Sequence, residues 1–160
     1  MERRFRKPEA QEVGRMFTFL LGRPVQVTKG SRIKTGVRDL WTVGVFTTKE
    51  DAVVGVCATD LPMAVHAGAA LSLFPPHKAK ACIARKAIDR PIWENTLEVY
   101  NVASRFFHDM HEGMIQVGDS YQKGDDVPLE VKQFMRRSTQ RVDLRVQITG
   151  YGGGSLALIG

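Results

Sequence analysis

The chain has 160 residues, of which 43% are hydrophobic and 25% are charged. This composition excludes a disordered chain. The chain is also long enough for one domain with its own core, so we expect a single domain over residues 1–160. The longest apolar stretch, at 61–74, is interrupted by His66 and is too short for a membrane-spanning helix. The N-terminus does not resemble a signal peptide, and Cys57 and Cys82 lack the spacing of a metal or redox motif. We therefore predict a cytoplasmic protein that does not associate with membranes.

The formal net charge is +6 at pH 7, and the excess of Lys and Arg lies near 1–7, 78–90 and 135–145. A basic surplus favours acidic partners, but scattered clusters of this kind more simply keep the protein soluble. The basic runs contain a single aromatic residue, Phe5, so base stacking has little support. Nucleic acid is therefore not an expected partner.

The first half of the chain predicts a helix, a short strand and a hairpin, in that order. The helix begins near Glu12 and ends at Gly22, because glycine readily adopts the left-handed conformation of a helix C-terminus. A strand follows at 24–27, then a polar loop. Two further strands, at 40–47 and 52–58, are joined by a turn.

The same order recurs in the second half. A helix capped by Asp89 continues to Gly113, and a strand at 114–117 and a polar loop follow. Apolar and polar residues then alternate in a strand at 141–149, which pairs with a strand at 155–159.

A third helix, over 62–73, begins after Asp60 as its N-cap, with Pro62 in the first turn. Together these elements predict an α+β fold with pseudo-twofold symmetry, whose halves are about 8–74 and 89–160. We expect an antiparallel sheet of about six strands, carrying two long helices on one face and one or two shorter helices.

The helix that follows Asp89 combines a hydrophobic surface with one narrow polar stripe. At about 100° per residue, the stripe consists of Glu94, Glu98, Asn101, Arg105 and His108. Its simplest interpretation is a solvated helix face. The other side of the helix should be buried, with Trp93, Leu97 and Phe107 in the core.

The alternative is that Glu98 and Asn101 form a functional pair. Three residues apart, they leave the same patch of the helix. The Asn amide can orient a water molecule without ionising, and the Glu carboxylate can dock against a Lys of a partner. Neither is a nucleophile, so the pair suits a reaction in which water attacks a group that another protein holds.

With this pair in this place, the sequence resembles the CheC/CheX/FliY chemotaxis phosphatases, and most closely the single-site CheX-like members. The resemblance rests on Glu98-Val-Tyr-Asn101, which matches the E-x-x-N motif, and on the order of elements through the two hairpins, at 44–56 and 145–159. It implies hydrolysis of the aspartyl phosphate of a CheY-type response regulator in two-component signalling. It also implies that Asn101 orients the attacking water and that Glu98 pairs with the receiver's active-site Lys. The receiver would supply Mg²⁺, so the chain needs no cofactor of its own.

Three features depart from the family pattern. Arg105 stands where Gly is common, and could either obstruct a receiver or meet its acidic pocket. Pro128 lies further downstream than the proline that is usual in the family. The first half reads Glu12-Val-Gly-Arg15 at the corresponding place, with Arg where the motif has Asn, so at most one half carries the motif. We therefore leave open whether the chain is a phosphatase or a non-catalytic signalling or oligomerisation module. Glu94 and Arg105 are expected to contribute to binding, and exposed edge strands would allow a homodimer.

Three other patterns have simpler interpretations. The cluster His108, His111 and Glu112 lies at a helix end, where His complements the helix dipole, so no metal site is predicted. The Gly-rich stretch 150–155 is a hairpin turn, because no helix follows it. The third pattern, a group of arginines, keeps a functional alternative open, since pairs of guanidinium groups bind phosphates well. It is an anion or cyclic-dinucleotide site formed by Arg136, Arg137 and Arg141.

Overall fold

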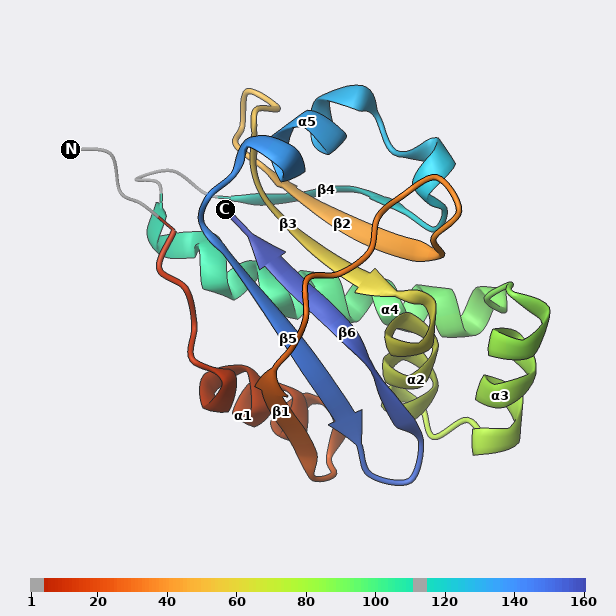
Figure 1. The fold of residues 1–160 in the computed structure, drawn as a ribbon. Coiled ribbons are helices and arrows are strands. Elements are labelled where there is room, and N and C mark those ends of the chain that lie inside the picture. The colour runs from red at the N-terminus through yellow and green to blue at the C-terminus, as the bar shows by residue number, and fades with distance from the viewer. Residues whose placement is uncertain (1–4, 111–114) are drawn as a thin grey trace.

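A computed structural model describes residues 5–110 and 115–160, which form one antiparallel sheet and the helices around it (Figure 1). In chain order, the elements are α1 (Ala10–Leu21), β1 (Val25–Lys29), β2 (Trp41–Thr47), β3 (Val53–Asp60), α2 (Leu61–Leu71), α3 (Pro76–Arg85), α4 (Arg90–Ala103), the 3-10 helix η1 (Ser104–Met110), β4 (Gln116–Tyr121), the 3-10 helix η2 (Gly124–Asp126), α5 (Leu129–Arg137), β5 (Arg141–Ile148) and β6 (Gly152–Ile159).

The strand order, β1-β5-β6-β3-β2-β4, has the predicted twofold symmetry. Exchanging the first three strands with the last three gives the same order read from the other edge. β3 and β6 form the centre, with Val56 opposite Ile159 and Thr59 opposite Leu156. The outer strands are exchanged between the halves, because β1 pairs with β5 and β4 pairs with β2. The α+β class and the six-stranded antiparallel sheet are confirmed.

Helices cover the two faces of the sheet unequally (Figure 1). α1, α2 and α4 lie against one face, whereas α5 lies against part of the other. Apolar and polar residues alternate along β5. Its apolar residues Leu144, Val146 and Ile148 are therefore buried in the core beneath α1, α2 and α4. A second core under α5 contains Val131 and Met135. Among the described residues, no helix is long and apolar enough to cross a membrane.

The predicted helix ends are formed by local interactions. Gly22 ends α1 with a φ of 65°, in the left-handed region. The carboxylate of Asp60 accepts a hydrogen bond from the backbone N–H of Met63 at 2.9 Å, which caps α2. Asp89 occupies the N-cap of α4, but its side chain pairs with Arg85 instead of capping the helix.

Several elements differ from the sequence-based prediction. α4 ends at Ala103 and the chain continues as η1, so it is not one helix up to Gly113, which lies outside the described residues. The Ser104 hydroxyl hydrogen-bonds the carbonyl of Asn101 at this transition. β4 begins at Gln116, not at residue 114, and continues to Tyr121. Part of the predicted second polar loop is α5, which buries an apolar side against the sheet.

His66 of α2 gives the fold a pH dependence. Its side chain is 8% exposed, and its Nδ1–H donates to the carbonyl of Gly153 on β6 at 2.9 Å. Burial lowers the pKa of His66 below its ordinary 6.5, and outweighs the hydrogen bond and Asp60, which act in the opposite direction. Between the two pKa values the unfolded chain therefore binds more protons than the folded chain. We expect the free energy of unfolding to decrease as the pH falls through about 6.5.

Denaturant titrations at a series of pH values would measure this effect. His66→Gln keeps a donor for the Gly153 carbonyl but cannot ionise, so it should flatten the pH dependence just below pH 6.5. An unchanged slope in this variant would assign the effect to other groups.

Candidate functional site on helix α4

The polar stripe of α4 faces solvent. Glu94, Glu98 and Asn101 are exposed, as is Arg105 in the first turn of η1. The opposite side of the helix is buried against the sheet and α2, through Ile92, Thr96, Val99, Tyr100 and Ala103. The side chains of Glu98 and Asn101 therefore point into solvent together, on the side of α4 that faces away from the sheet.

The hydrophobic neighbours of the stripe are less buried than predicted. Phe107 is fully buried, as expected, and stacks on Phe5. Trp93 and Leu97 are only partly buried, and Trp93 meets the ring of Tyr100 edge-on. The prediction of full burial was wrong for these two residues because they lie at the margin of the helix face that meets the core. They leave partly exposed apolar surface beside Glu98 and Asn101.

Other polar residues of α4 are engaged within the protein. The Asn95 amide donates to the carbonyl of Gly68 at 2.9 Å and to the Ser72 hydroxyl at 2.8 Å, which ties α4 to α2. The Thr96 hydroxyl donates to the carbonyl of Ala64, also on α2. Glu94 forms an exposed ion pair with Arg90 at 3.1 Å.

The side chains of Glu98 and Asn101 differ from these neighbours. Within residues 5–110 and 115–160, neither side chain forms a hydrogen bond or an ion pair. Their donor and acceptor atoms are therefore available to a partner. Glu94, the other residue of the stripe within α4, differs from them because its carboxylate is paired with Arg90.

Tyr100 anchors the helix directly beside Asn101. Its ring covers Gly44 of β2, where a Cβ atom would lie 2.6 Å from the ring, so only glycine allows this approach. The Tyr100 hydroxyl is buried and forms hydrogen bonds with the hydroxyls of Thr42 and Thr59. Burial raises the pKa of Tyr100. The pair thus projects from a rigidly packed helix, as a site with fixed geometry requires.

The corresponding part of α1 is used differently. Glu12 accepts a hydrogen bond from the backbone N–H of Glu9 in a capping box and lies 3.8 Å from Arg6. Arg15, which occupies the place of Asn101, is exposed. The first half therefore offers no second acid–amide pair, in agreement with its sequence.

The other candidate residues are not brought into one site. No group of three or more His, Cys, Asp or Glu residues that could hold a metal occurs in the described residues. His108 is exposed, whereas His111 and Glu112 lie outside the described part of the chain. The stretch 150–155 includes the tight turn between β5 and β6, as predicted.

The three arginines of the predicted anion site are divided between two hollows of the surface. Arg141 forms two hydrogen bonds of 2.8 Å with the carboxylate of Asp143. Burial raises the pKa of Asp143, but the hydrogen bonds from Arg141 and from the Ile33 N–H outweigh it and hold the pKa below its ordinary value. Arg136 and Arg141 line one small hollow together with Lys132, whereas Arg137 lines a different one. Arg137 is separated from Arg136 because the side-chain directions of successive helix residues differ by about 100°.

No family model matches the sequence, and no curated protein matches it. The fold, however, is similar to known structures. The FliG–FliM complex from H. pylori matches at 12% identity with a TM-score of 0.54, over 94% of this chain and 85% of the matched chain. FliY from Thermotoga maritima matches at 12% identity with a TM-score of 0.52, over 98% and 91% of the two chains.

A complex of CheX and CheY with BeF3 and Mg²⁺ from Borrelia burgdorferi matches at 10% identity with a TM-score of 0.54, over 96% of this chain and 98% of the matched chain. The chain therefore has the fold that CheX and FliY share with FliM. At the level of the fold, the resemblance to the CheC/CheX/FliY family is confirmed.

Proposed function

We propose that the chain binds a phosphorylated CheY-type receiver domain through α4 and hydrolyses its aspartyl phosphate. The observation that carries this proposal is the pair Glu98 and Asn101, exposed together and without partners in the described part of the chain. CheX has the same fold as this chain, and its structure in complex with CheY supports a receiver domain as the partner. This function would place the protein in chemotaxis or a related two-component pathway.

The chemistry needs positioning more than covalent catalysis. A water molecule attacks the phosphorus, the bond to the receiver's aspartate breaks, and inorganic phosphate and the free carboxylate result. Asn101 would hold this water in line with the leaving oxygen, and Glu98 would pair with the receiver's Lys. The receiver would hold Mg²⁺, which neutralises charge on the phosphoryl oxygens. Correct placement of a reactant is among the largest contributions that a protein makes to such reactions.

A non-catalytic binding module is the second candidate. The similarity to FliM favours it, because FliM was crystallised with FliG, which shows this fold in a protein–protein complex. A homodimer through the sheet edges, β1 and β4, belongs to the same proposal.

The decay of a phosphorylated receiver, measured with Mg²⁺ in the presence and absence of this protein, tests the proposal. A phosphatase accelerates the decay at substoichiometric concentration. If receivers from the host bind but decay no faster, the binding module is the correct function. If none binds, both proposals fail and only the fold assignment remains.

Arg105 is expected to strengthen receiver binding. It is exposed one turn beyond Asn101, where its guanidinium group can meet acidic groups around the phosphorylated aspartate. Arg105→Gly should raise the Kd for the phosphorylated receiver by about tenfold, the effect of losing one charge-assisted hydrogen bond. Binding titrations at two salt concentrations would measure this. Faster dephosphorylation by the variant would instead show that Arg105 obstructs the approach.

A further inference from the structure

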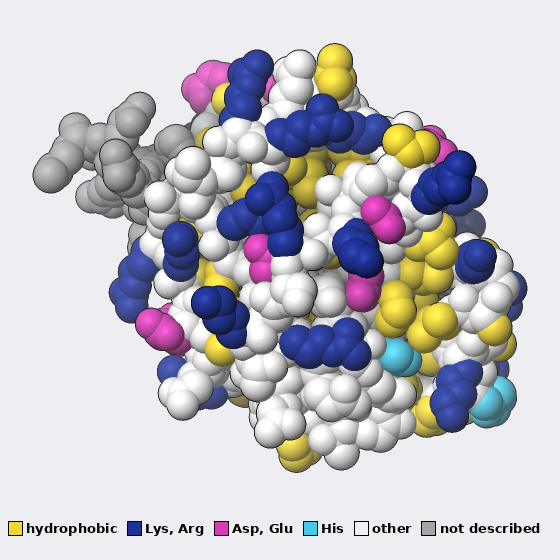
Figure 2. All heavy atoms as spheres, viewed as in Figure 1, with side chains coloured by type: hydrophobic (Ala, Val, Ile, Leu, Met, Phe, Trp, Pro, Cys, Tyr) yellow, Lys and Arg dark blue, Asp and Glu magenta, His cyan; other side chains and the backbone are white. Residues whose placement is uncertain are grey.

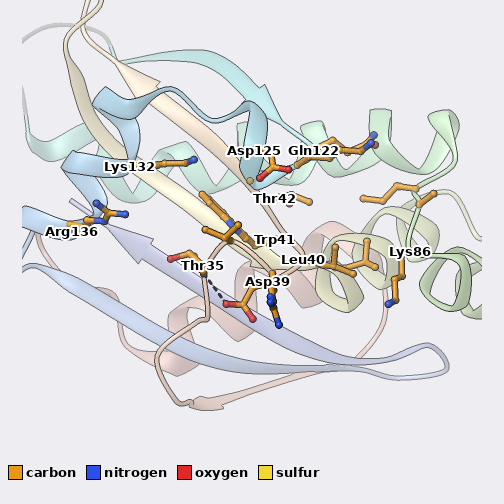
Figure 3. Close-up of a pocket in the computed structure, with 18 residues that line it drawn as sticks. Thr35, Asp39, Leu40, Trp41, Thr42, Lys86, Gln122, Asp125, Lys132 and Arg136 are labelled. Atoms are coloured by element: carbon orange, nitrogen blue, oxygen red, sulfur yellow. Dashed lines mark hydrogen bonds between the residues drawn. The ribbon is translucent and has the colours of Figure 1, made fainter.

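A cavity of about 360 Å³ opens beside the first residues of β2, on the side of the sheet that α5 covers (Figure 3). Four segments that are distant in sequence form its walls: the loop before β2 at 35–40, the link between α3 and α4 at 86–88, the segment 122–125, and α5. Its volume lies within the range of small-molecule sites. α4 packs on the other face of the sheet, so the cavity is separate from Glu98 and Asn101.

Basic side chains dominate the lining. They outnumber the acidic ones by five to two: Arg38, Lys86, Lys123, Lys132 and Arg136 against Asp39 and Asp125. None of the five forms an ion pair with another described residue. Asp39 is partly engaged, because its carboxylate accepts a hydrogen bond from the Gly36 N–H at 2.8 Å. Lys and Arg side chains also spread over this face of the molecule, where they outnumber the acidic side chains that lie among them (Figure 2).

The cations surround an apolar surface. Lys132 and Arg136 approach from α5 and Lys86 from the opposite side, with Trp41 and Leu40 between them (Figure 3). Leu40 is 48% exposed, an uncovered hydrophobic side chain at the cavity.

Trp41 is 3% exposed and packs against the backbone at Gly124, where a Cβ atom would lie 2.3 Å from the indole nitrogen. The floor of the cavity is therefore fixed by close packing. Apolar surface next to uncompensated cations suits a ligand with both a flat ring and an anionic group.

We propose that this cavity binds an organic phosphate of the mononucleotide class. Lys132 and Arg136 hold the phosphate, and the ring lies against the exposed side chain of Leu40, next to the buried Trp41. Arg136 suits the phosphate because a guanidinium group can donate two parallel hydrogen bonds to its oxygens. Binding here is independent of the proposed phosphatase activity, because it needs neither a receiver nor the side chains of α4.

Calorimetric titration of the whole protein with AMP tests the affinity, and tryptophan fluorescence tests the location. Trp93→Phe leaves Trp41 as the sole tryptophan, so a saturable change in its emission on adding AMP reports on the cavity floor. We expect inorganic phosphate alone to bind at least about tenfold more weakly, because it makes no contact with the apolar surface.

The combined variant Lys132→Ala and Arg136→Ala should raise the Kd for AMP by at least about tenfold. Arg137→Ala is the control for the Arg136 substitution, since it removes one arginine charge from the next position of α5, where Arg137 lines another hollow. Its Kd should stay within about twofold of the wild type. An equal loss in this control, equal affinity for phosphate and AMP, or no saturable binding of AMP would overturn the proposal. Tighter binding of a single-stranded oligonucleotide than of AMP would also overturn it.

Discussion

Asn101→Ala is expected to abolish the acceleration of receiver dephosphorylation and to leave receiver binding nearly unchanged. An amide that holds the attacking water acts mainly in the transition state, so its loss lowers the rate more than the affinity. We expect a decrease of at least about a hundredfold in the accelerated rate, the scale of losing correct placement of a reactant. Asn101 is exposed and its side chain has no partner within the described residues, so the variant should fold normally.

Glu98→Ala should behave differently from Asn101→Ala. A carboxylate that pairs with the receiver's Lys contributes to docking as well as to the reaction, so both the Kd and the rate should worsen. Gln133→Ala and Glu130→Ala are matched controls, because they remove an exposed amide and an exposed carboxylate from α5, on the other side of the sheet. Full activity of Asn101→Ala would exclude the proposed role of Asn101.

Local patterns predicted most helices and strands, because the signals that determine them lie close together in the sequence. Gly22 and Asp60 mark helix ends through conformation and hydrogen bonding within a few residues. The alternation in β5 gave the face of the sheet that it buries. The exchange of β1 and β4 between the halves could not be predicted, because pairing such as Val25 with Ile148 joins residues far apart in the sequence.

Helical periodicity also predicted that Glu98 and Asn101 are exposed together. It could not separate them from Asn95, a residue of similar chemistry on the same helix, because the partners of Asn95 are Gly68 and Ser72 on and beyond α2. The cavity next to Trp41 was likewise not foreseen. Its lining comes from four separate segments, and one of them, α5, was expected to be a loop.

The contact between α2 and α4 that supports the candidate site depends on Gly68. A Cβ atom there would lie 2.4 Å from the carbonyl oxygen of Ile92 and 2.6 Å from the Thr96 hydroxyl. The first of these is backbone, so an alanine can be accommodated only if the helices separate. Separation would strain the hydrogen bonds that Asn95 and Thr96 make to α2. We expect Gly68→Ala to lower the free energy of unfolding by about 2 kcal/mol, within the usual cost of overpacking.

Gly14→Ala is the matched control, because Gly14 is also a buried glycine within a helix. Its added Cβ atom would meet nothing closer than the carbonyl oxygen of Val25 at 3.5 Å, an ordinary contact. The higher helix propensity of alanine should then stabilise this variant by about 0.5–1 kcal/mol. Urea titrations of both variants against the wild type measure the difference. If Gly68→Ala is as stable as the wild type, α2 and α4 do not pack as closely as the structure shows, and the rigid support inferred for Glu98 and Asn101 is lost with that contact.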